Sequence, residues 1–112
     1  MTSRNKTATR TVLGLGLLAI LMSSGGQVMA SEALARKQGC LGCHAMEAVL
    51  VGPSYRQVAE KYSGDKEALT AVTRQIREGS SGTWGDMVMP PQPQVSAADA
   101  KRLAKWILGG TR

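Results

Sequence analysis

The chain has 112 residues, a formal net charge of +6, one His, two Cys and no Phe. Its Lys and Arg residues are dispersed along the sequence, which argues against nucleic-acid binding, because that function gathers basic residues on one face. With two Cys and one His, the chain also lacks the four Cys or His ligands of a usual structural zinc site.

The first thirty residues have the three parts of an export signal. Three basic residues precede an apolar run from Val12 to Met22, and small and polar residues then lead to Ala30. We expect a secretory signal peptide of residues 1–30, cleaved near Ala30, and a periplasmic domain formed by the 82 residues 31–112. The alternative is a membrane anchor, but the apolar run is well short of the roughly twenty residues that a spanning helix needs.

Four short helices are predicted in this domain, and no segment alternates between apolar and polar residues as a half-buried strand would. Polar caps, apolar residues three and four apart and closing glycines define their ends. The first predicted helix spans residues 32–38. The other three begin at a capping box at Ser54, a cap at Asp65 and a cap at Ser96, and they end at Gly64, Gly79 and Gly109 respectively. The segment 80–93 has three Pro, two Gly and no periodicity, which predicts an irregular loop of functional importance.

Residues 40–44, Cys-Leu-Gly-Cys-His, form the arrangement that attaches c-type haem. On one turn of helix, Cys40 and Cys43 lie on the same face, so each thiol can bond one vinyl group of a single haem c. His44 is then placed to supply the proximal iron ligand. A thioredoxin-like thiol pair is disfavoured because it would follow a strand in a βαβ unit, and a disulfide would form only if haem did not capture the thiols. A flat apolar cofactor would also complete the core of a small domain without Phe.

The second axial ligand of the iron must come from a Met, because the chain has no other His. Met46 lies two residues from His44 and is expected on the same side of the haem. Met87 and Met89 are two residues apart, so both can face the iron from an extended segment, and direction alone does not choose between them. We choose Met89, because the two prolines after it stiffen the backbone that holds a weak thioether ligand. Met87 is expected to line the apolar rim of the haem edge.

With these residues the chain resembles the class I c-type cytochromes, in particular the short bacterial branch with one haem. The matching segments are 39–44, Val51-Gly52-Pro53, Trp84-Gly85, Met89-Pro90-Pro91 and 103–107. The resemblance implies an all-α fold of about four helices around one covalently attached haem, and it supports Met89 as the ligand. It also implies that the Pro53 carbonyl accepts a hydrogen bond from His44 and that the Trp84 indole donates to a haem propionate. Plain core packing is the alternative for Trp84.

Two residues depart from the pattern of this family. Members often have an Arg near a propionate where this chain has Gln75, and an Asn after the proline pair where it has Gln92. Arg74 or Arg77 could take over the role of that Arg. If neither does, the burial of the propionate is less compensated and the reduction potential is expected to differ from that of relatives.

The sequence therefore predicts a periplasmic monohaem electron carrier and not an enzyme, since an iron with both axial positions filled has no open site. Expected partners are redox proteins of the respiratory chain, such as a nitrite reductase, a terminal oxidase or a quinol-oxidising complex. We expect a monomer without stable membrane insertion or nucleic-acid contact. A basic rim could steer acidic partners, or could be only a solvated surface. It would comprise Arg36, Lys37, Lys101, Arg102 and Lys105.

Two other classes of function remain as alternatives. A haem-based ligand binder or peroxidase-like protein would require Met89 to leave the iron and open a site. A haem-free thiol protein would use the two Cys residues without any cofactor.

Overall fold

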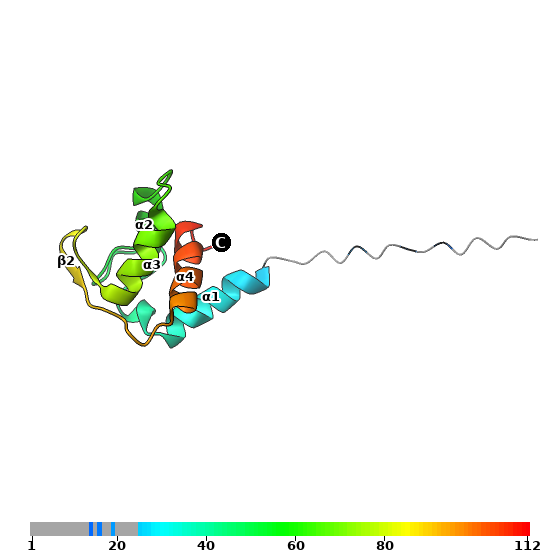
Figure 1. Cartoon of the computed structure of the whole chain (residues 1–112), viewed down its shortest axis with the longest axis horizontal. Helices are drawn as coiled ribbons and strands as arrows, with labels where there is room; N and C mark the ends of the chain where they lie inside the picture. Colours follow the sequence, from blue (N-terminus) through cyan, green and yellow to red (C-terminus); the bar gives the residue numbers. More distant parts are fainter. Residues whose placement is uncertain (1–13, 15, 17–18, 20–24) are drawn as a thin grey trace, which may run out of the picture.

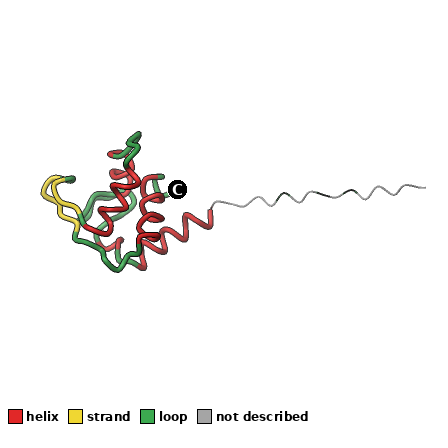
Figure 2. Tube along the Cα trace, in the orientation of Figure 1, coloured by secondary structure: helices red, strands yellow, loops and turns green. Residues whose placement is uncertain are grey.

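The computed structural model describes residues 14, 16, 19 and 25–112, so most of the predicted signal peptide lies outside the described residues. Within the described part, four α-helices and one short 3-10 helix account for about half of the residues, and a two-stranded sheet adds to them (Figures 1 and 2). The elements are α1 (Gly25–Lys37), η1 (Cys40–Gly42), α2 (Tyr55–Lys61), α3 (Ala68–Glu78), β1 (Ser80–Gly82), β2 (Gly85–Met89) and α4 (Ala97–Leu108). No helix in the described residues has the length and apolarity required to cross a membrane.

Helix α1 begins at Gly25, earlier than the predicted start at Glu32, and it runs through the expected cleavage position. Its last turn carries Arg36 and Lys37, where positive charge interacts favourably with the helix dipole. The chain then turns at Gly39, whose φ of 79° lies in the left-handed region that favours glycine. This turn leads directly into η1, which holds Cys40.

Helix α2 begins at the predicted capping box. The Ser54 hydroxyl accepts a hydrogen bond from the Gln57 N–H at 3.1 Å, and the Gln57 side-chain oxygen accepts one from the Ser54 N–H at 3.0 Å. Ser96 caps α4 in a similar way, because its hydroxyl accepts from the Asp99 N–H at 3.1 Å. Both predicted helix starts are confirmed.

The predicted cap of the third helix is wrong by two residues, because the N-cap position is Glu67. Asp65 does not cap α3, which begins at Ala68. Its carboxylate instead accepts a hydrogen bond from the Glu67 N–H at 2.8 Å, within the turn that precedes the helix. A short acidic side chain that bonds its own nearby backbone stabilises a turn at the expense of the helix.

The predicted irregular loop contains a β-hairpin, which corrects the sequence interpretation. Strand β1 pairs antiparallel with β2, with Ser80 opposite Met89 and Gly82 opposite Gly85. Strands of three and five residues are too short to give a reliable alternation signal. An isolated hairpin is marginally stable. This one is tied to α3, since the Gln92 N–H donates to the Ile76 carbonyl at 3.2 Å just after β2.

The core lies around α4, which contacts α1, α2 and α3. Leu103 and Ala104 are fully buried on this helix, and Val72 and Ile76 face them from α3. In the view of Figure 2, the helices gather together while the strands form an outlying hairpin. Between the helices and the hairpin lies a cavity that the fold does not fill with its own side chains.

Candidate cofactor site

A cavity with about 1080 Å³ of empty volume, including the part open to solvent, lies between the helices and the hairpin. All six residues that the sequence assigned to the site line this cavity. They are Cys40, Cys43, His44, Pro53, Trp84 and Met89. The fold therefore brings together side chains from η1, from the segment before α2 and from the hairpin.

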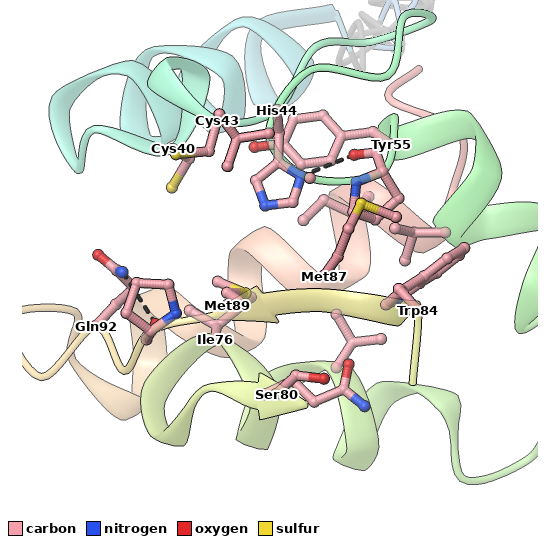
Figure 3. Close-up of a pocket in the computed structure, with 18 of the residues that line it drawn as sticks. Cys40, Cys43, His44, Tyr55, Ile76, Ser80, Trp84, Met87, Met89 and Gln92 are labelled. Atoms are coloured by element: carbon pink, nitrogen blue, oxygen red, sulfur yellow. Dashed lines mark hydrogen bonds between the residues drawn. The ribbon is translucent and has the colours of Figure 1, made fainter. Parts of the chain in front are cut away.

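His44 is held with one ring nitrogen turned away from the cavity. Its Nδ1 lies 2.8 Å from the Pro53 carbonyl oxygen, which can only accept, so the Nδ1–H donates (Figure 3). This is the contact that the resemblance implied. The other ring nitrogen points into the cavity, and in the neutral imidazole it carries no hydrogen, as a metal ligand requires.

Two further residues fix the plane of the His44 ring. A Cβ atom on Gly52 would lie 2.6 Å from His44 Cε1, so only glycine allows the backbone to approach the ring this closely. The Tyr55 ring stacks on the imidazole at a centroid distance of 5.4 Å and an interplanar angle of 18°. Sequence reasoning gave neither residue a role, although Gly52 belongs to the Val-Gly-Pro segment of the resemblance.

The two thiols differ in their surroundings. Cys40 is half-buried and Cys43 is exposed, and neither is joined in a disulfide. Burial raises the pKa of the Cys40 thiol above its usual value, whereas a redox-active thiol of the thioredoxin type needs a lowered pKa. No group of three or more His, Cys, Asp or Glu side chains within the described residues could hold a metal ion alone.

The opposite wall of the cavity carries two thioethers. Met87 and Met89 are half-buried on one face of β2, while Val88 between them is 65% exposed. Figure 3 shows Met89 on the hairpin, across the cavity from Cys40, Cys43 and His44, and Met87 extending from the same strand toward His44 in this view. Both Met residues line the cavity, and the choice of iron ligand between them stays a prediction.

The remaining lining fits a flat apolar cofactor. The inner faces of α3 and α4 supply hydrocarbon side chains, and no Asp, Glu, Lys or Arg among the described residues lines the cavity. The buried aliphatic residues of the lining are Val58 of α2, Val72 and Ile76 of α3, and Leu103 and Ile107 of α4. Two thiols and one imidazole on one wall, with thioethers opposite, are a donor set that suits covalently attached haem.

Gln75 and Gln92, the two residues that differ from the family pattern, each form a hydrogen bond within this chain. Gln75 lines the cavity, and its Nε2 donates to the Tyr62 hydroxyl at 2.9 Å. Gln92 donates to the Pro90 carbonyl at 3.1 Å. Arg74 and Arg77 do not line the cavity; they line a separate depression with Lys101. The structure thus gives no support to Arg74 or Arg77 as a substitute for the family Arg.

Comparisons with known proteins agree on one family. The family model described as Cytochrome c matches residues 28–111. Cytochrome c-552 of Hydrogenobacter thermophilus is 46% identical over 92 residues, which is 82% of this chain and 93% of that protein. Cytochrome c-551 of Pseudomonas aeruginosa is 41% identical over 96 residues, covering 84% of this chain and 91% of that one. The crystal structure of wild-type Nitrosomonas europaea cytochrome c552 matches with a TM-score of 0.68 and 46% identity, covering 70% of this chain and 96% of that chain.

Proposed function

Because this chain belongs to the cytochrome c family, as a small class I c-type cytochrome with one covalently attached haem c, we propose that it is a one-electron carrier and not an enzyme. The proposal rests mainly on the positions of two possible iron ligands on opposite sides of the cavity. His44 presents a free ring nitrogen on one side of an apolar cavity, and β2 presents thioether sulfurs on the other. An imidazole and a thioether together fill both axial positions of a haem iron, which is typical of electron-transfer cytochromes.

We assign the haem contacts to residues that line the cavity. Cys40 and Cys43 would form the two thioether bonds, and His44 and Met89 would be the two iron ligands. When bound, the haem supplies an iron that alternates between the ferric and ferrous states. The Pro53 carbonyl keeps His44 in one tautomer and one orientation, and the Trp84 indole donates to a haem propionate.

The apolar edge of the cavity is the surface that we propose for electron exchange. The large apolar side chains that are exposed in the described part are Val49, Leu50, Val51 and Val88. Val51 and Val88 also line the cavity, so this patch adjoins the cofactor position. A contiguous exposed apolar patch is typical of a contact surface.

The predicted basic rim is a weaker candidate for docking. Arg36 is paired with Glu32 at 3.0 Å and Arg102 lies 3.5 Å from Asp99, so two of its five charges have acidic neighbours. Lys101 lines the depression that also contains Arg74 and Arg77, and this depression is separate from the cavity. We therefore propose partners that bury an apolar surface against the cavity mouth, among them a nitrite reductase, a terminal oxidase or a quinol-oxidising complex.

We also propose that the protein works in the periplasm as a monomer, after removal of residues 1–30. The composition of the leader supports export, and covalent haem attachment requires reduced thiols in a compartment that otherwise favours disulfides. The functional domain is then 31–112.

The test uses the full chain expressed in a host that exports and matures c-type cytochromes. We expect the intact mass to include one haem and to lack the leader, and the alkaline pyridine spectrum to report two thioether bonds. The reduced protein at neutral pH should bind carbon monoxide slowly or not at all. Rapid stoichiometric binding would support the ligand-binding alternative, and a bare-chain mass would overturn the assignment of Cys40 and Cys43.

A further inference from the structure

The lining of the cavity is uncharged, although the chain has 14 Lys and Arg residues. A haem carries two carboxylates, and carboxylates in protein sites are usually paired with a cation or held by several hydrogen bonds. The polar side chains that line the cavity, apart from the Cys and His residues, are Tyr55, Gln75, Ser80, Trp84 and Gln92. Each of these is neutral, so any carboxylate held inside the lining meets only neutral donors.

Gln75 is the residue of this set that is held in place by a second side chain. It is half-buried, and its Nε2 donates to the Tyr62 hydroxyl oxygen at 2.9 Å. The Gln75 amide has a second N–H that can donate. The Tyr62 hydroxyl acts as the acceptor in this bond, so its own hydrogen can also donate. The pair therefore retains two donors and has no negative charge.

The cations nearest in sequence to Gln75 are directed elsewhere. On a helix, residues three and four apart share a face, so Gln75 and Ile76 face the cavity together with Val72, whereas Arg74 and Arg77 do not line it. Arg77 donates through Nε to the Val95 carbonyl at 3.3 Å, and Arg74 lines the same outer depression as Arg77.

The other charged groups around this side of the cavity are at its margin. Lys61 has its ammonium 5.0 Å from the centre of the Trp84 ring, and it is exposed. Glu60 lies 3.9 Å from Arg56, and Glu78 lines the outer depression. Asp86 on β2 is exposed, and Ser80 and Thr83 present only hydroxyls that bond each other at 3.1 Å.

We propose that Gln75, oriented by Tyr62, is the uncharged hydrogen-bonding group for one haem carboxylate, which this protein therefore holds without a cation from α3. The inference rests on the proposed function and adds a positioning residue for its cofactor. A carboxylate that is partly desolvated and lacks a paired cation has a raised pKa. Ionisation of that carboxylate adds negative charge near the iron and stabilises the ferric state. The reduction potential should therefore fall as the pH rises through that pKa.

The test is the reduction potential of the holoprotein, measured by spectroelectrochemistry between about pH 5 and 9, a range above the ordinary carboxyl pKa. The native protein should show a fall in potential with one inflection in this range. Gln75→Arg should move the inflection about one to three pH units lower, because an opposite charge favours the ionised carboxylate, and should raise the potential at pH values above both inflections, where the carboxylate is ionised in both proteins. Tyr62→Phe should move the inflection in the opposite direction by a smaller amount, because the amide loses its orienting partner.

Arg74→Gln and Arg77→Gln are matched controls on the same helix, and both should leave the inflection unchanged. A native potential that is independent of pH would overturn the proposal, and so would a Gln75→Arg variant that titrates like the native protein. Equal shifts in the two Arg controls would assign the effect to general surface charge and would also overturn it. Covalent haem and the thioether-to-ferric-iron absorption band are recorded for every variant. Their loss in the native protein would count against the proposed function instead.

Discussion

The two walls of the cavity are built in different ways. The wall that carries His44 is fixed by local contacts: the Gly52 N–H donates to the Cys43 carbonyl at 2.9 Å, and the Tyr55 N–H donates to the Ala45 carbonyl at 2.9 Å. The wall that carries the Met residues is a short hairpin at the margin of the molecule, tied to α3 beyond its end. Backbone hydrogen bonds close to His44 therefore hold the His44 wall in place. The hairpin wall depends instead on the residues that follow β2.

This difference has a chemical consequence for the iron. Under the proposed ligation, an imidazole whose orientation is fixed by a carbonyl and a stacked ring should remain in place in both oxidation states. A thioether on a marginal hairpin would be the weaker of the two ligands, so exchange with outside ligands is expected at the hairpin side. The contrast can be tested by breaking each wall separately.

The largest effect is expected from the hairpin wall. Met89→Ala should remove the thioether-to-ferric-iron absorption band and should allow rapid carbon monoxide binding to the reduced protein, because an axial position is opened. Met87→Ala is the matched control on the same strand face and should keep the band. Visible spectra of the two ferric holoproteins decide between the residues. Loss of the band in Met87→Ala alone would reverse the ligand assignment.

A second, smaller effect is expected from the His44 wall. Gly52→Ala would place a Cβ atom 2.6 Å from His44 Cε1, so the ring or the backbone must move. Overpacking of this kind costs about 1 to 3 kcal/mol, and we expect a loss of that order in the free energy of unfolding. Denaturant unfolding of the holoprotein measures it.

Gly42→Ala, on the same side of the cavity, is the control, because a Cβ at that position meets nothing within 4 Å. The Gly52 variant should keep both axial ligands, so its spectrum should stay close to that of the native protein. Unfolding free energies that fall equally in both variants would show that the close approach of Gly52 to the ring has no special role.

The His44 wall was more predictable from the sequence than the hairpin wall, and the reason is physical. The two thiols and His44 are contiguous in the chain, so their relation is fixed by local geometry. The contact between His44 and Pro53 spans nine residues, and it followed only from the resemblance. The approach of Gly52 to the imidazole depends on how the chain folds back, which no local pattern reveals.

The hairpin wall could be predicted only in part. The period of two correctly placed Met87 and Met89 on one face, but for the same reason it could not separate them. The strands were missed because three and five residues of mixed polarity give no alternation that exceeds chance. The position of Arg74 and Arg77 outside the cavity could have been predicted from the sequence. Val72 and Ile76 mark the buried face of α3, and the helical period places the two Arg residues off that face.

The smallest effect is expected at the helix cap that supports the His44 wall. Ser54 follows Pro53 directly and is fully buried, whereas Ser96 caps α4 and is exposed. Removing either hydroxyl loses a capping bond, which costs about 0.5 to 2 kcal/mol, and we expect Ser54→Ala near the upper end of that range and Ser96→Ala near the lower end. Thermal unfolding of the two holoproteins gives the comparison. Equal losses would mean that the first wall draws no additional support from the start of α2, because only Ser54 adjoins the carbonyl that orients His44.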